Sequence, residues 1–214
     1  MKTEDLISML STNVEVVDHR RVGRNIGMAV AAGAAVAVAT VFFVLGPRAD
    51  LTTVGTFVAP LLKVAFTFII LVPASIYLIR LTRPGGERRS SSVALVALPF
   101  IAIMLLVAVS LQFAPSSHWK GTILSDEWLE CLISIPFIAI VPFSVIIWAV
   151  RQMAPTDLAR TGAFAGLVAG CLSATGYALH CADDTVLFFA MWYGGTIALC
   201  TYAGWKLGPK LLRW

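Results

Sequence analysis

The chain has 214 residues, of which 58% are hydrophobic and 13% are charged, and its formal net charge is +4. A soluble domain is about 45–50% apolar and about 25% charged, so this composition excludes a cytosolic enzyme, a disordered regulator and a soluble nucleic-acid-binding domain. The four cysteines include no C-x-x-C motif, which excludes a zinc ribbon and a thioredoxin-type site. A polytopic membrane protein is the class that remains.

The first predicted element is a short helix in the polar N-terminal segment, residues 1–24. Thr3 can cap a helix over residues 4–10, which has acids in its first turn and an apolar stripe behind them. Such a stripe can lie on a membrane surface or fill the groove of a partner protein, and the acids favour a basic partner. The candidate partner-binding residues are Glu4, Asp5, Leu6, Ile7 and Leu10.

Six apolar stretches follow, each near the length of about 20 residues that crosses a bilayer. They cover residues 26–45, 57–79, 93–113, 131–150, 161–179 and 186–207. We therefore predict an all-α fold, a polytopic membrane helix bundle with six transmembrane helices. Residues 1–24 are the expected cytoplasmic segment and residues 25–214 the transmembrane domain.

The charged residues orient this bundle. Thirteen of the 16 basic residues lie in the N-terminal segment, the second and fourth connectors and the C-terminal tail, which all lie on one side of the predicted bundle. The net charge of these segments is +7. The other three connectors carry −4. Because positive charge stays on the cytoplasmic side, both termini are predicted to be cytoplasmic. The basic balance is then explained by topology and by contact with anionic lipid rather than by nucleic acid.

Two features inside the spans concern packing and charge. The fifth span contains Gly162, Gly166 and Gly170, which would let a second helix approach closely, either within the bundle or across a homodimer interface. Lys63 is the only basic residue well inside a span. It is expected to reach the headgroups or to pair with an outer carboxylate, and a functional charge is the remaining interpretation. No span contains Asp or Glu, which disfavours transport.

Two of the four cysteines are predicted to lie at the outer face. Cys131 opens the fourth span and Cys181 follows the fifth, whereas Cys171 and Cys200 lie within spans as apolar filler. The outer pair is interpreted as a sensor, with a structural disulfide and two unrelated thiols as alternatives. The polar neighbours that could ligate a soft metal ion beside them are His180, Asp183, Asp184, Glu130 and His118.

Several short segments together resemble a known family. They are the start MKTEDLISML, the RLTRPG loop after the second span, Cys131 at the start of the fourth span, MAP at residues 153–155, the segment YALHCADD, MWY at residues 191–193 and the end LLRW. The pattern is similar to the NrsF-type family of negative regulators of an extracytoplasmic-function sigma factor of the sigma F kind. The resemblance covers essentially the whole chain.

The resemblance implies an inner-membrane anti-sigma factor. Its N-terminal segment would sequester the sigma factor, and its paired outer cysteines, Cys131 and Cys181, would sense oxidants or thiol-reactive metals. The expected protein is not an enzyme, requires no cofactor and makes no direct contact with nucleic acid; a heavy-metal ion at the sensor cysteines is the one ligand expected. A small membrane transporter or metal exporter is the alternative, and a membrane thiol-disulfide enzyme is a third.

Overall fold

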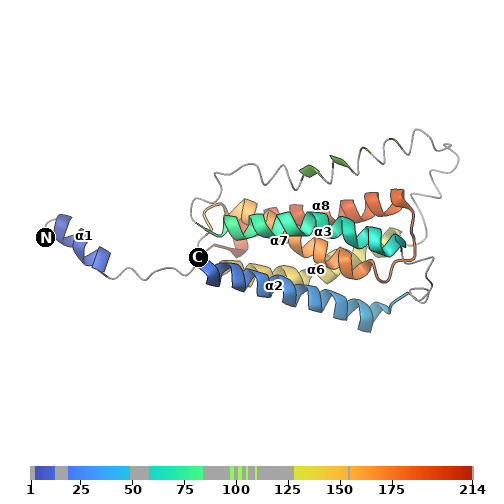
Figure 1. Ribbon diagram of the computed structural model, residues 1–214, viewed down its shortest axis with the longest axis horizontal. Helices are drawn as coiled ribbons and strands as arrows, with labels where there is room; N and C mark the ends of the chain where they lie inside the picture. The colour runs from blue at the N-terminus through green and yellow to red at the C-terminus, as the bar shows by residue number, and fades with distance from the viewer. Residues whose placement is uncertain are drawn as a thin grey trace.

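The computed structural model describes residues 3–12, 19–48, 58–83, 97–98, 101–102, 105, 109, 128–153 and 155–213 (Figure 1). Within these ranges the chain is helical and contains no strand, which confirms the predicted all-α class for the part described. The helices are α1 (Thr3–Thr12), α2 (His19–Thr40), which continues as the π-helical turn η1 (Val41–Leu45), α3 (Val58–Leu81), α6 (Trp128–Arg151), α7 (Leu158–Tyr177) and α8 (Val186–Leu211).

Five of the six predicted spans correspond to these long helices. The predicted third span, residues 93–113, lies mostly outside the described residues, although the six of its residues that are described are helical. The predicted fifth span extends to residue 179, but α7 ends at Tyr177 and the chain turns over residues 178–180. This difference places Cys181 in a loop that folds back on the end of α7.

Four helices in the described part of the chain are long and apolar enough to cross a membrane. They are Gly23–Leu45, Pro60–Leu81, Trp128–Arg151 and Leu158–Tyr177. Helix α8 has 26 residues but includes two lysines and a proline near its C-terminal end, and it is not among the four. The structure thus supports a membrane protein.

Helix α7 forms the centre of the bundle. It contacts α2, α3, α6 and α8, and most of its residues are buried (Figure 1). Its first turn is capped by Asp157, whose carboxylate accepts a hydrogen bond from the backbone N–H of Arg160 at 2.9 Å. Because α7 is covered on several sides, small residues along it let the neighbouring helices approach closely.

The glycines of α7 bring its backbone into direct contact with α8. A β-carbon added at Gly162 or Gly166 would collide with the backbone of α8, and one added at Gly208 would lie 2.8 Å from the Cα of Gly162. A β-carbon at Gly170 would lie 3.0 Å from the Cβ of Cys200. Gly162, Gly166 and Gly170 are therefore buried within one chain, between two of its own helices.

Candidate functional site

The Cys181 loop, residues 178–185, joins α7 to α8 and is held by hydrogen bonds at both ends. The backbone N–H groups of His180 and Cys181 both donate to the carbonyl oxygen of Tyr177, at 2.9 and 3.0 Å. Before α8, the carboxylate of Asp183 accepts hydrogen bonds from the backbone N–H of Thr185 at 3.0 Å and from its hydroxyl at 2.8 Å. Asp183 therefore shapes the turn into α8.

The side chain of Cys181 points into the protein and is only 1% exposed. Its thiol lies 3.9 Å from the backbone carbonyl oxygen of Asp183. Cys131, in the first turns of α6, is also fully buried, and neither cysteine is in a disulfide. The phenol of Tyr193 on α8 interacts electrostatically with the thiols of both Cys131 and Cys181. Tyr193 is therefore a common neighbour of the two predicted sensor residues.

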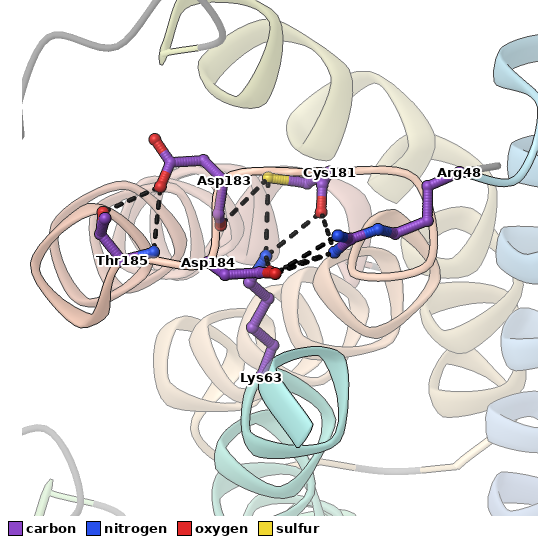
Figure 2. A network of polar contacts seen from close by, with 6 residues as sticks. All are labelled: Arg48, Lys63, Cys181, Asp183, Asp184 and Thr185. Carbon is purple, nitrogen blue, oxygen red and sulfur yellow. Dashed lines mark hydrogen bonds and ion pairs between the residues drawn. The ribbon is translucent and has the colours of Figure 1, made fainter. Parts of the chain in front are cut away.

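Two cations meet beside Cys181 (Figure 2). Lys63 extends from α3, and its ammonium lies 3.0 Å from the Oδ1 atom of Asp184, 3.2 Å from the carbonyl oxygen of Cys181 and 3.9 Å from its Sγ atom. Arg48 binds the same carboxylate, with Nη1 at 3.0 Å from Oδ1 and Nη2 at 3.3 Å from Oδ2. Of the roles expected for Lys63, the structure shows the ion pair.

Both cations are buried, whereas the carboxylate between them is partly open. The side chains of Lys63 and Arg48 are 0% and 5% exposed, and that of Asp184 is 31% exposed. Partial burial opposes the ionised form of Asp184, but the hydrogen bonds and positive charges of Arg48 and Lys63 outweigh it, so the pKa of this carboxyl lies below its usual range. We call these three residues the Arg48–Asp184–Lys63 cluster.

The Cys181 loop is also tied to the end of α2. Gly46 follows η1 with a φ of +80°, a conformation that favours glycine because it has no β-carbon. The turn brings the backbone N–H of Arg48 to 3.2 Å from the carbonyl oxygen of Leu179. The Nδ1 atom of His180 makes a 2.7 Å hydrogen bond with the carbonyl oxygen of Gly46. Together with the side chain of Arg48, these contacts join α2 to the loop.

The polar residues that were predicted to surround the thiols thus have separate roles. His180 binds the end of α2, Asp183 binds Thr185, and only Asp184 belongs to the cluster beside Cys181. Glu130 is exposed in the first turn of α6, and His118 lies outside the described residues. Among the residues that were described, no three His, Cys, Asp or Glu side chains come together so that they could hold a metal ion.

The predicted partner-binding residues lie in α1, which sits apart from the helix bundle (Figure 1). Leu6, Ile7 and Met9 are 43%, 61% and 67% exposed, although their side chains are apolar. Glu4 and Asp5 are in the first turn of the helix and are also exposed. The side chain of Leu10 lies outside the described residues.

A bundle of long apolar helices with an exposed terminal helix and a buried thiol pair is what a regulatory membrane protein would require. The comparisons with known proteins agree. The family model described as the negative regulator of sigma F matches residues 10–214, so the chain belongs to the NrsF family, which is regulatory and non-enzymatic.

Two relatives match over the full length of both chains. The probable anti-sigma-F factor NrsF of Azospira oryzae is 29% identical over 214 residues, and the anti-sigma-F factor NrsF of Caulobacter vibrioides is 29% identical over 218 residues. No solved structure matches the chain.

Proposed function

We propose that this chain is a membrane-bound anti-sigma factor that sequesters an extracytoplasmic-function sigma factor of the sigma F kind. It releases the sigma factor when Cys131 and Cys181 react with an oxidant or with a thiol-reactive metal ion. Family membership and two full-length anti-sigma-F relatives support the sequestering role. The observation that supports the switch is the position of α2, which starts in the N-terminal segment. At its other end, the residues that follow α2 and η1 are hydrogen-bonded to the Cys181 loop.

The proposed topology has six spans in the bacterial inner membrane, with both termini in the cytoplasm. The four long apolar helices and the distribution of basic residues support it. In this orientation α1 faces the cytoplasm, where a sigma factor is found, and the Cys181 loop faces the oxidising side. Reactive molecules from outside would then meet the thiols before any cytoplasmic component.

Helix α1 is the proposed sigma-binding element. Its apolar side chains Leu6, Ile7 and Met9 are exposed, and such a stripe gains free energy when a partner's groove covers it. Glu4 and Asp5 add negative charge at the start of the helix, which favours a basic surface on the partner. The helix has only 10 residues, so it gains stability from a bound partner.

The proposed switch begins with a change in the two thiols. Disulfide formation would transfer two electrons from the pair to the oxidant and release two protons, whereas binding of a metal ion would release one proton from each thiol that ligates it. In this proposal the metal ion is the signal and not a resident cofactor. Either change alters the packing at the start of α6 and in the Cys181 loop.

The loop can pass this change to α2 through Arg48 and His180. Both residues bridge the loop and the end of α2, so a shift of the loop changes the position that α2 prefers. A signal moves the population only by its differential affinity for the two states, about 1.4 kcal/mol for each tenfold change. A modest rearrangement at the thiols would suffice to weaken the hold on the sigma factor.

A reporter under a sigma-dependent promoter tests the sequestering role. Deletion of residues 1–20 is expected to leave the promoter permanently active, while the full chain keeps it silent until oxidant is added. If the truncated chain still represses at the same membrane level, α1 is not the binding element.

A further inference from the structure

We propose that a groove between α6 and α8 binds one acyl chain of an anionic phospholipid, whose phosphate lies beside Lys206 and Lys210 at the end of α8. The groove is on the outside of the helix bundle and takes no part in the proposed thiol switch. A phospholipid requires that the bundle lies in a membrane, which its four long apolar helices support. The identity of the partner protein does not affect this inference.

The groove has a volume of about 260 Å³, and the residues that line it are apolar. Its base is formed by Gly166 and Ala169 of α7, which are buried between the two flanking helices. Its rim is formed by exposed side chains, among them Ile140 of α6 and Leu199 and Leu207 of α8. Sites for whole small molecules measure about 300–1,000 Å³, so this smaller groove suits a single acyl chain.

The groove leads toward the end of α8, which lies beside the start of α7. A β-carbon added at Gly208 would lie 2.5 Å from the carbonyl oxygen of Leu158, the first residue of α7. Tyr202 and Trp205 are exposed in the same part of α8, and aromatic residues at a helix end are typical of the level of the lipid headgroups. Because Leu207 is the last groove residue along α8, the groove ends at this level.

Two lysines lie where the groove meets the headgroup level. Lys206 and Lys210 are both exposed and are one helical turn apart. Lys210 comes seven residues after Ala203 and three after Leu207, so it continues the groove-lining face of α8. The ammonium of Lys206 lies 4.8 Å from the centroid of the Trp205 ring, which keeps its charge at the same level.

The charge at this end of the groove is positive. No Asp or Glu follows position 184 in the sequence, and the carboxylate of Asp157 before α7 is bound by Arg160 at 3.1 Å. An apolar groove that ends at two lysines is complementary to a molecule with a long apolar chain and an anionic head. An anionic phospholipid has both parts, whereas a soluble anion would use only the lysines and a helix of a second copy only the groove.

The lysines are tested by native mass spectrometry of the full chain in a nonionic detergent. The chain is titrated with phosphatidylglycerol or with phosphatidylcholine of the same acyl chains. The wild type is expected to retain one phosphatidylglycerol at a concentration about tenfold lower, since each lysine near the surface contributes about fivefold. Lys210→Gln should reduce this preference by about fivefold. Arg24→Gln is the matched control, because it removes an exposed positive charge from α2, and it should leave the preference unchanged.

The groove is tested by Ala203→Phe, whose ring would fill it. This variant should retain either lipid about fivefold more weakly. Ala198→Phe is the matched control, since Ala198 is an exposed alanine of the same helix that does not line the groove, and it should bind as the wild type does. Circular dichroism reports whether each variant is folded, and Ala203→Leu replaces Ala203→Phe if the latter is not.

Equal retention of the two lipids by the wild type, or an unchanged preference in Lys210→Gln, would overturn the proposal. Unchanged retention in the folded groove variant, or displacement of the lipid by soluble glycerol 3-phosphate, would also overturn it, because the head would then bind without the chain. A lipid-free dimer in the spectrum would assign the groove to a second copy instead. No sigma factor is needed, so a failure here leaves the anti-sigma proposal standing, and loss of sigma capture alone would leave this inference standing.

Discussion

The ammonium of Lys63 lies 3.0 Å from the carboxylate of Asp184, and this ion pair joins the apolar helix α3 to the loop between α7 and α8. Lys63 is fully buried, and the carboxylate of Asp184 compensates its charge there. Breaking a buried ion pair by removing one member is strongly destabilising because an uncompensated charge remains. The pair is therefore both a structural link and the point at which the thiol site can be perturbed.

Asp184→Asn should lower the free energy of unfolding by about 2–3 kcal/mol, since Lys63 and Arg48 would lose their shared carboxylate. The measurement is a denaturing-detergent titration in mixed micelles. Asp157→Asn is the matched control, because Asp157 is 28% exposed, close to the 31% of Asp184, and also binds an arginine. The control should cost about 0.5 kcal/mol or less, because Asn still accepts the cap hydrogen bond and the exposed ion pair with Arg160 contributes little. Equal losses in the free energy of unfolding for the two variants would show that the cluster stabilises the fold no more than an exposed ion pair does.

The stability of the protein should depend on acid pH through Asp184. Its pKa lies below the usual range in the folded state, so the unfolded chain takes up the proton first and acid favours unfolding. The contribution is expected to be complete above about pH 5 and to be lost as the pH falls below about 4. Unfolding titrations from pH 7 to pH 3 should show the wild type and Asp184→Asn converging at low pH. A gap that stays constant down to pH 3 would contradict the assignment.

Gly166→Ala should destabilise the bundle by about 1–3 kcal/mol, because the new methyl group would meet the backbone of Cys200 and lie 3.2 Å from the Cα of Gly204. Gly195→Ala is the control: it changes the same residue type within α8, and an added β-carbon there meets nothing within 4 Å. The control should be neutral or slightly stabilising, since alanine favours helix. Similar effects of both substitutions would mean that α7 and α8 do not pack as closely as described.

Ile7→Asp should reduce capture of the sigma factor by about tenfold or more, because it places a charge in the exposed apolar stripe of α1. Ser11→Asp adds the same charge to an exposed position of the same helix and should change capture much less. Capture is measured by affinity isolation from solubilised membranes. If the two variants bind equally well, the apolar face of α1 is not the contact surface.

Much of the fold could be predicted because burial in a membrane leaves a strong pattern. Long apolar runs defined the helices, and the small residues at positions 162, 166 and 170 indicated where another helix comes close. The end of α7 is harder to predict, because Ala178 and Leu179 are apolar and give no signal for a turn. The turn is closed by hydrogen bonds from the backbone N–H groups of His180 and Cys181 to the carbonyl oxygen of Tyr177. The helix boundaries therefore follow local hydrogen bonding more than hydropathy.

The site could be predicted only in part. Lys63 stands out in the sequence as a lone charge in an apolar run, and pairing with an outer carboxylate is one of the outcomes that this position predicts. The sequence does not assign Arg48 to the site, because its partner Asp184 is 136 residues away and only the packing of α2 and α3 against α7 brings the two together. Its one signal is that it is one of only two basic residues in the three acidic connectors. His180 was expected near the thiols but binds Gly46 instead, a contact that depends on the turn after η1.

We propose that the chemical state of Cys131 and Cys181 controls how tightly the protein binds a sigma factor. The most direct measurement is affinity isolation of the tagged full chain from solubilised membranes, with and without a thiol oxidant, followed by quantification of the bound sigma factor. The wild type is expected to retain the sigma factor only without oxidant, and the Cys131→Ser/Cys181→Ser variant is expected to retain it in both samples. Equal recovery from both wild-type samples, or release from the serine variant by oxidant, would contradict it.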